Sequence, residues 1–263
     1  GGVHRIGFIT SVLVPIMAGS YLLIGLYTII TNISELPHVF SMILSQAFDF
    51  QAFAGGMAGS AVVIGIKRGL FSNEAGMGSA PNASAAVSHP AKQGMVQVLS
   101  VFIDTLLICS ATAMMLLLSG VEGKTGVLDG IPFVQKAVSA NVGNWGIHFI
   151  TLSIFAFAFS SLIGNYYYAE SNILFIKNNK KLLFVFRITC ILAVFFGAQA
   201  DFSMMWNIAD ITMGCMATVN IIVILILGNK AIRVLKDYEK QKKEGKDPVF
   251  SAKDAGIDNA DCW

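Results

Sequence analysis

The amino-acid sequence predicts an all-α polytopic membrane protein with six transmembrane segments, one of which is broken. Hydrophobic residues make up 55% of the 263 residues and charged residues only 13%, and the mean hydropathy is +0.67. The apolar residues gather in six stretches that each reach the length of about 20 residues needed to cross a bilayer. One of these stretches is interrupted at residues 68–82 by three glycines, a proline and the ionisable Glu74.

The predicted spans are separated by connections of unequal length. They cover residues 10–31, 56–88, 95–119, 146–174, 182–200 and 203–228. Two further stretches, Pro37–Phe50 and Val127–Ser139, have apolar residues on one helical face but are too short to cross a bilayer. We expect both to form helices that lie across the outer side of the protein and cap a central cavity.

The positions of the basic residues predict the orientation. Six crossings put both termini on the same side of the membrane. That side carries Arg5, Lys92, Lys177, Lys180, Lys181, Lys230, Arg233 and Lys236. The opposite connections carry Glu35, Asp49, Glu122 and Asp129 against Lys124 and Lys136 alone. The positive-inside rule therefore predicts a multi-pass protein of the plasma membrane with both termini of this chain in the cytoplasm.

A change of composition at residue 230 divides the chain into two parts. Residues 1–229 form the predicted transmembrane core, and residues 230–263 form a polar cytoplasmic tail rich in Lys, Glu, Asp and Gln. Such a tail is typical of a solvated helix end that fades into disorder. Contact of its lysines with anionic lipid headgroups is a second interpretation.

Several function classes lack support in the sequence. No basic patch with interleaved aromatic residues indicates nucleic-acid binding, and the net charge is only +2. The four histidines and four cysteines show no metal-ligand spacing, so we expect no cofactor and no metal other than a coupling ion. Three of the cysteines lie inside predicted spans, where they act as small hydrophobic residues.

The broken span at residues 68–82 carries the main functional signal. Irregular backbone survives in hydrocarbon only where it contacts protein or lines a cavity. Gly69, Gly76 and Gly78 permit unwinding, which frees N–H groups for a carboxylate and C=O groups for a cation. Further polar groups and a helix-starting proline come from Ser72, Asn73, Ser79 and Pro81. The alternative is a packing kink whose small residues admit a neighbouring helix.

Glu74 is an intramembrane carboxyl group, which by default indicates function. Its candidate partners are a proton, the ammonium group of a substrate, Arg68, and a group outside this chain. We favour a structural or gating role over direct substrate contact. Lys67 and Arg68 precede the break, where they either close an ion pair in one access state or extend to the membrane interface.

Ser160 and Ser161 are adjacent hydroxyl residues within the fourth span. Hydroxyl oxygens that face inward can bind sodium, which as a hard cation prefers oxygen ligands. The alternative is that each serine hydrogen-bonds to a carbonyl of its own helix.

Five stretches of the sequence together resemble the alanine or glycine:cation symporter family, also called sodium:alanine symporters. They are GLFSNEAGMGSAPNASAA, HPAKQG, VQVLSVFIDTLLICSATAMMLLLSG, FAFSSLIGNYYYAE and WNIADITMGCMATVN. The resemblance extends to about residue 235. It implies sodium-coupled symport of a small neutral amino acid, alanine or glycine, by alternating access.

The resemblance also implies a fold. Family members have a leucine-transporter-like fold of two inverted five-helix repeats and are longer than this chain. On that mapping the chain is the second half of the fold and its partner is a missing N-terminal half. Residues 56–88 are then the broken sixth core helix, residues 146–174 the eighth and residues 203–228 the tenth.

Specific roles follow from this mapping. The sodium ligands on the eighth helix are Ser160 and Ser161. Trp206, which opens the last span, forms a wall or outer gate of the substrate cavity, although an aromatic residue there is equally typical of the membrane interface. The break supplies the remaining substrate-binding residues, which are Ser72, Asn73, Ala75, Gly76, Met77 and Gly78. Arg68 and Glu74 are assigned to gating or an ion pair.

Two other functions fit parts of the pattern. Gly-Met-Gly-Ser79 superficially resembles the nucleophile loop of a serine hydrolase, with His148 as a base. An intramembrane hydrolase is disfavoured because no glycine follows Ser79 and no orienting acid is evident. A channel or a transporter of a different small solute fits the same broken helix. We therefore expect a transporter and not an enzyme.

Overall fold

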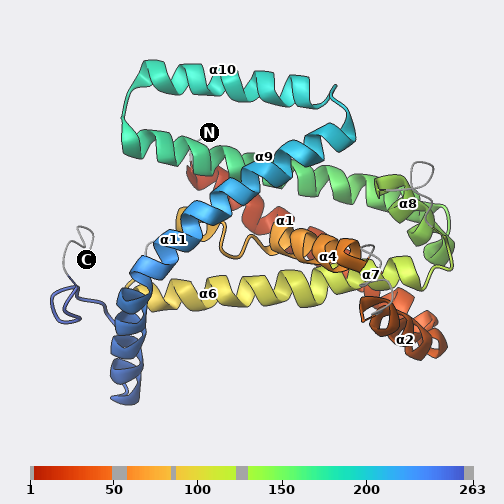
Figure 1. Ribbon diagram of the computed structural model, residues 1–263, viewed down its shortest axis with the longest axis horizontal. Helices are drawn as coiled ribbons and strands as arrows, with labels where there is room; N and C mark the ends of the chain where they lie inside the picture. Colours follow the sequence, from red (N-terminus) through yellow and green to blue (C-terminus); the bar gives the residue numbers. More distant parts are fainter. Residues whose placement is uncertain (1–2, 49–57, 84–86, 123–129, 258–263) are drawn as a thin grey trace. The chain divides into compact units, whose positions relative to one another are not determined.

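The computed structural model describes residues 3–48, 58–83, 87–122 and 130–257, and their regular secondary structure is entirely helical (Figure 1). The helices are α1 (Val3–Thr31), η1 (Ile33–Glu35), α2 (Leu36–Ala47), α4 (Ala58–Asn73), α5 (Ser79–Asn82), α6 (Pro90–Phe102), the π-helical η2 (Ile103–Cys109), α7 (Ser110–Leu117), α8 (Gly130–Val142), α9 (Trp145–Ile176), α10 (Lys180–Gly197) and α11 (Phe202–Lys243). They form two compact units. The first contains Gly1–Ile66 and Ile103–Leu183, and the second contains Lys67–Phe102 and Phe184–Trp263.

Each predicted span contains a helix, and four helical stretches among the described residues are long and apolar enough to cross a membrane. These are Ser11–Thr31, Pro90–Leu117, Trp145–Ile176 and Phe202–Lys243. The described helix α4 has only 16 residues, and the 18 residues of α10 include Lys180, Lys181 and Arg187. The all-helical fold class is confirmed, whereas the number of six spans stays a prediction.

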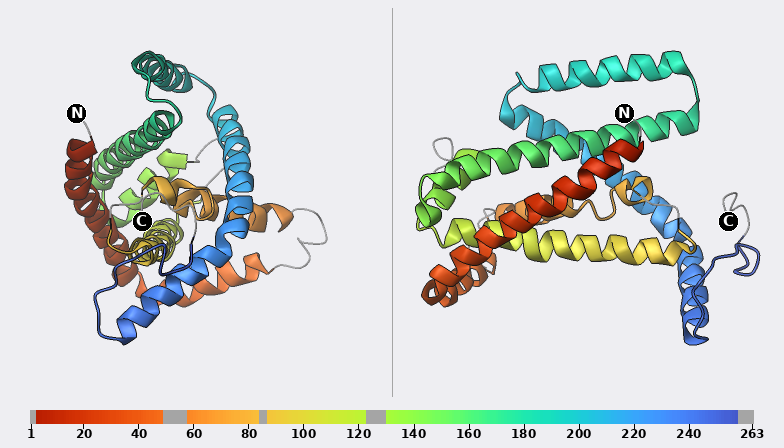
Figure 2. Two further views of the ribbon diagram at one scale, coloured as in Figure 1. Left: turned by 90° about the vertical axis from the view of Figure 1, so that its left-hand side faces the viewer. Right: turned by 180° about the vertical axis from the view of Figure 1, so that it is seen from behind.

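The first unit is held together by apolar packing around α1. Its core contains Tyr21 and Ile24 of α1, Met115 of α7, Val138 of α8 and Ile150 of α9. Figure 2 shows α1 running alongside α9, in agreement with the contacts between these two helices. Met115, Val138 and Ile150 are nearly inaccessible to solvent, so these helices share a closely packed core.

Two close contacts fix α1 against the neighbouring helix α7. The hydroxyl groups of Tyr21 and Thr112 are hydrogen-bonded at 2.9 Å, which satisfies a buried phenol. A Cβ atom added to Gly25 would lie 2.8 Å from the Cβ of Ala111. Only glycine therefore permits this approach, as in membrane helix pairs that meet through small residues.

The two short helices predicted beside the spans are confirmed as helices. Helix α2 buries Val39 against Met114 and Leu118 of the first unit. Helix α8 is joined to the end of α1 by a hydrogen bond from the amide nitrogen of Asn32 to the amide oxygen of Asn141, at 3.2 Å. Residues 49–50 and 127–129 of the predicted elements lie outside the described residues.

The second unit is organised along α11, which has 42 residues. The helix starts at Asp201, whose carboxylate accepts a hydrogen bond from the backbone N–H of Met204 at 3.0 Å. Its apolar side chains are largely exposed, as at Leu225 and Ile226, which keep 76% and 71% of their surface accessible. A long exposed apolar helix requires lipid or protein around it, as expected for a membrane span.

The polar tail predicted from residue 230 differs from a helix end that fades into disorder. Helix α11 continues to Lys243, and residues 247–252, here called the C-terminal clasp, fold back onto the start of α6 (Figures 1 and 2). The backbone N–H of Phe250 donates to the carbonyl of Ser88 at 2.8 Å. Gln241 exchanges two hydrogen bonds with the backbone of Val249, at 2.9 and 3.0 Å. Phe250 itself is buried, so the segment has an apolar anchor.

His89 lies at the centre of this contact and is completely buried. Its Nδ1 accepts a hydrogen bond from the N–H of Ala91 at 3.1 Å, so the proton of the neutral ring is on Nε2. That nitrogen lies 3.3 Å from a carboxylate oxygen of Asp237 on α11, to which it donates. The rings of Tyr238 and Phe250 pack edge-on against the imidazole. The histidine thus joins α6, α11 and the clasp.

An exposed ion pair adds to the clasp. Lys92 Nζ lies 2.7 Å from Asp247 Oδ1, and this hydrogen bond and charge lower the pKa of the Asp247 carboxyl group. A lowered pKa in the folded state means that the pair stabilises the clasp above the ordinary pKa of aspartate. This contribution disappears as the pH falls through the lowered value.

Replacing His89 with alanine is expected to release the clasp, because both hydrogen bonds of the imidazole and its contact with Phe250 are lost. We expect chymotrypsin to cleave after Phe250 faster in the His89→Ala variant than in the wild type, by about tenfold. The matched control is His148→Ala on α9, where the histidine is exposed. Equal cleavage rates in the His89→Ala variant and the wild type would contradict this role.

Candidate functional site

The break between α4 and α5 is a five-residue segment, residues 74–78, with three left-handed backbone conformations. The φ angles are +52° at Glu74, +84° at Gly76 and +92° at Gly78. Glycine adopts this region freely, whereas a residue with a Cβ atom pays about 1–2 kcal/mol in strain. Glu74 is the single non-glycine residue with positive φ among the described residues. Strain at this position is typical of a functional segment.

Local hydrogen bonds give the break a defined shape. The N–H of Glu74 donates to the carbonyl of Leu70 at 3.0 Å and closes the last turn of α4. The side-chain oxygen of Asn73 accepts from the N–H of Ala75 at 3.0 Å, forming an Asx turn. The N–H of Met77 then donates to the carbonyl of Glu74 at 3.0 Å. The break is therefore a structured loop.

The backbone groups of the two left-handed glycines are satisfied unequally. The carbonyl of Gly76 accepts from Nδ2 of Asn220 on α11 at 2.9 Å, and that of Gly78 accepts from Nδ2 of Asn82 at 3.0 Å. Within the part of the chain that the structure describes, the N–H groups of both glycines lack a hydrogen bond. These glycines thus offer donors, which suit an anion such as a carboxylate.

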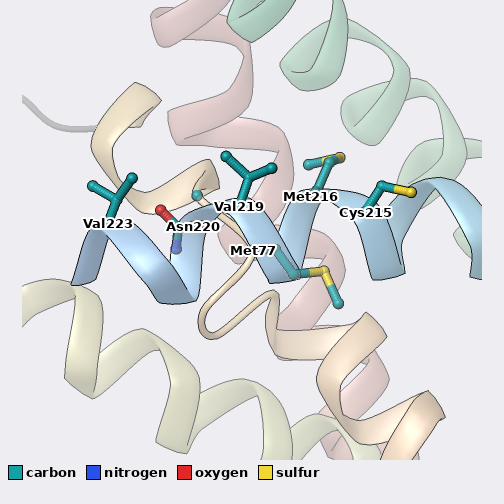
Figure 3. Close-up of a pocket in the computed structure, with 7 residues that line it drawn as sticks. Met77, Cys215, Met216, Val219, Asn220 and Val223 are labelled. Carbon is teal, nitrogen blue, oxygen red and sulfur yellow. The ribbon is translucent and has the colours of Figure 1, made fainter. Parts of the chain in front are cut away.

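An open groove of about 460 Å³ runs beside the break along α11. In Figure 3 the side chains of Cys215, Met216, Val219 and Val223 project from the same side of the helix, and Met77 crosses α11 from the break. Met77 and Gly78 line the groove from the broken segment, and Asn220 contributes its amide. The groove is therefore apolar apart from this amide and the backbone of the break.

A smaller pocket of about 200 Å³ lies on the other side of Met77. It is lined by Lys67, Leu70, Phe71, Met77, Asp210, Met213, Gly214 and Ala217. The side chain of Met77, which is 92% inaccessible to solvent, contributes to both the pocket and the groove. The flexible thioether is suited to a wall that must adapt to its contents.

A charged cluster joins the last turns of α4 to the start of α11. Arg68 Nη2 donates to Asp210 Oδ2 at 3.2 Å, while Nη1 approaches Oδ1 at 3.2 Å without hydrogen-bond geometry. The guanidinium carbon lies 4.2 Å from the centre of the Trp206 ring, in a cation–π contact. The Trp206 ring also packs against Phe71, with a centroid distance of 5.1 Å. Lys67 is more distant, at 3.5 Å from Asp210 Oδ2.

The predicted substrate residues fall within the second unit. The break contains Ala75, Gly76, Met77 and Gly78. Asn73 is the last residue of α4, and the exposed Ser72 directly precedes it. Trp206, at the start of α11, packs against Arg68 and Phe71 of α4. Whether these residues bind substrate stays a prediction.

The candidate gating residues have different environments. The ion pairs of Arg68 are made with Asp210, and among the described residues Glu74 forms no ion pair with Arg68. The structural contribution of Glu74 is its backbone, which caps α4 and starts the break.

Ser160 and Ser161 lie on α9 in the first unit. The hydroxyl of Ser160 donates to the carbonyl of Phe157 at 2.9 Å, the bond to its own helix that the alternative interpretation describes. Ser161 is exposed. The hydroxyl oxygen of Ser160 retains lone pairs for a cation, so the assignment of these residues to sodium stays a prediction.

Two further residues of the site lie in the last predicted span and were given no role from the sequence. Asp210 is the acidic partner of Arg68, and Asn220 is the amide that binds the break. Their positions inside an apolar helix were the available signal, because polar groups at such depth are usually paired or functional. The sequence did not reveal the partner of either residue.

An apolar all-helical chain with a structured break, free backbone donors and a lining helix defines a class of multi-pass membrane transport proteins. The chain matches the model of the sodium:alanine symporter family over residues 1–252. It belongs to this family, whose members are symporters, and the hydrolase alternative is therefore set aside.

Individual relatives agree with this assignment. The chain is 50% identical to the amino-acid carrier protein AlsT of Bacillus subtilis, over 100% of this chain and 57% of the relative. It is 45% identical to the probable sodium/glutamine symporter GlnT of the same organism, over 100% of this chain and 55% of the relative. It is 36% identical to the sodium/alanine symporter AgcS of Methanococcus maripaludis, over 92% and 54% respectively. The chain thus spans just over half the length of these relatives.

The Arg68–Asp210 pair is expected to stabilise the second unit more than the Lys67 contact does. Arg68→Ala leaves the carboxylate of Asp210, whose side chain is only 22% exposed, without its main partner and lowers the free energy of unfolding by about 1–3 kcal/mol. Lys67→Ala removes a 54% exposed ammonium group and changes it by less than about 0.5 kcal/mol. Thermal unfolding in detergent measures both. Equal shifts for the two variants would contradict the assignment of Arg68 as the main partner.

Proposed function

We propose that the chain is part of a sodium-coupled symporter of small neutral amino acids, with alanine or glycine as substrate. Its membership of the sodium:alanine symporter family supports this proposal. So does its similarity to a relative named as a sodium/alanine symporter. The break and its groove supply the amino-acid site, and sodium is the coupling ion.

The observation that carries the proposal is the pair of N–H groups at Gly76 and Gly78, which have no partner within the described ranges and lie beside an apolar groove. An amino acid presents a carboxylate next to a side chain. The carboxylate would accept hydrogen bonds from the two N–H groups, which in a medium of low dielectric are strong donors. A small aliphatic side chain would then lie against Met77, Met216 and Val219.

We assign sodium to the hydroxyl groups of Ser160 and Ser161. A hard cation prefers oxygen ligands, and neutral hydroxyls bind it without adding charge inside the membrane. The bond that Ser160 donates to Phe157 orients its hydroxyl hydrogen toward the helix and leaves the oxygen lone pairs for the ion. Sodium bound there would stabilise the conformation that binds the amino acid, which is the thermodynamic basis of coupling.

The proposal includes the architecture implied by the family resemblance. The chain would form the second half of a leucine-transporter-like fold, with six spans in the cell membrane and both of its termini in the cytoplasm. Alternating access would move this half against an N-terminal half of the same protein. The Arg68–Asp210 pair under Trp206 would close the site from one side, and Glu74 would set the hinge of the break.

The native Cys215 lines the groove and reports its occupancy. In the full-length protein that the gene encodes, with its other cysteines replaced by alanine, we expect alanine plus sodium to protect Cys215 from a maleimide. At ten times the dissociation constant the modification rate should fall by about tenfold, because only the free protein reacts. A variant retaining only Cys190 of α10 serves as the control. Protection equal to that of Cys190, together with absence of sodium-dependent alanine uptake, would overturn the proposed function.

The sodium assignment has its own test in the same preparation. Ser160→Ala/Ser161→Ala is expected to raise the sodium concentration for half-maximal alanine uptake by about tenfold or more, because two of the ion's oxygen ligands are removed. Thr151→Ala on the same helix is the control, since that exposed hydroxyl bonds to its own backbone and to the amide of Gln135. If the double variant keeps the sodium dependence of the wild type, sodium binds elsewhere.

A further inference from the structure

Asn220 stands out because its amide is directed from one apolar helix to the backbone of another segment. It is half-buried in α11, and both its neighbours on the next turns, Met216 and Val223, are apolar. Its Nδ2 group donates to the carbonyl of Gly76, which is 144 residues away in the sequence. The other amide that binds the break, Asn82, comes from the same segment, only four residues from Gly78. Asn220 thus makes a tertiary contact between α11 and the break.

The hydrogen bond of Asn220 helps to hold one peptide group of the break in a single orientation. The peptide between Gly76 and Met77 has its carbonyl bound by Asn220 and its N–H bound to the carbonyl of Glu74. A peptide plane held at both ends cannot rotate without breaking one of these bonds. The N–H groups of Gly76 and Gly78 belong to the two peptide groups on either side of this one, so the fixed plane restricts their orientation.

The amide of Asn220 also packs closely against the second glycine. A Cβ atom added to Gly78 would lie 3.3 Å from the amide carbon and oxygen of Asn220. By contrast, a Cβ atom added to Gly76 would meet nothing within 4 Å. Asn220 therefore meets the break at two points: it donates a hydrogen bond to Gly76, and it leaves little room for a side chain at Gly78.

Helix α11 holds the broken segment at two levels. Asp210 binds Arg68 before the break, and Asn220 binds Gly76 within it. Ten residues separate Asp210 and Asn220, which corresponds to about 15 Å along the helix axis. The first contact is a partly exposed ion pair of the kind that can open, whereas the second orients the backbone that faces the groove.

We propose that Asn220 is a positioning residue of the amino-acid site, which acts by holding the N–H groups of Gly76 and Gly78 in the orientation that binds the substrate carboxylate. This inference rests on the proposed function. It assigns Asn220 no direct role in sodium binding or in the rate of the conformational change. Loss of its hydrogen bond should therefore weaken amino-acid binding selectively.

The test uses Asn220→Asp, which keeps the shape of the side chain but places a carboxylate oxygen opposite the carbonyl of Gly76. In proteoliposomes with the full-length protein we expect the KM for alanine to rise by about tenfold or more. The maximal rate and the sodium concentration for half-maximal uptake should change by less than about twofold. A contact that only supports amino-acid binding raises the KM when it is lost and leaves the rate of turnover unchanged. Asn220→Ala should raise the KM in the same direction.

Asn207→Asp is the matched control, because Asn207 is an exposed asparagine on the same helix. It should leave the KM for alanine within about twofold of the wild type. An equal rise in KM for the two Asn→Asp variants would overturn the proposal. So would a loss of maximal rate in Asn220→Asp with an unchanged KM, since that result assigns the residue to turnover.

A second readout is independent of transport. In protein that retains only Cys215, release of the break in Asn220→Ala should raise the maleimide modification rate in the absence of amino acid by about threefold or more. An unchanged rate would show that Asn220 does not hold the break. If the wild type neither transports alanine nor shows protection of Cys215, the proposed function fails, while the modification rate still tests the structural role of Asn220.

Discussion

The structure of the second unit depends on one constraint, which is that a backbone polar group in an apolar environment requires a partner. Between Asn73 and Ser79 the helix is interrupted, and the regular hydrogen bonds are replaced by turns and by side-chain amides. At Gly76 and Gly78 the carbonyls are satisfied, whereas the N–H groups have no hydrogen-bond partner among the described residues. Such groups are costly in hydrocarbon, so a ligand that accepts hydrogen bonds is the natural complement to this segment.

This constraint also explains why polar residues occur in α11. Most of the helix is apolar and exposed, as a membrane span requires. Asp210 and Asn220 depart from this pattern because each binds a group of the broken segment, Arg68 and the carbonyl of Gly76 respectively. The helix thus serves both as a surface for its apolar surroundings and as the support of an irregular loop. Removal of either polar group would leave its partner without compensation.

The sequence was informative where the cause of a structure is local. The position of the break was predictable because glycine favours positive φ, and the helices because their apolar runs are long. The partner of Arg68 was not, because Glu74 and Asp210 are equally acidic and only the fold brings Asp210 within 3.2 Å. The clasp was not predicted, because the polar composition of the tail indicated disorder. The apolar Phe250 was the one residue that indicated packing, and in the structure it is buried against His89.

The division of labour within the site bears on specificity. On the proposed function, the backbone donors of the break bind the carboxylate, which is common to all amino acids. Discrimination then falls to the side chains of the groove, such as Met216, Val219 and Cys215 on α11. This arrangement allows one family to include relatives named for alanine and for glutamine. Backbone N–H groups are common to all residues except proline, whereas the groove can change one side chain at a time. Variation on α11 can therefore alter the substrate while Asn220 keeps the break in place.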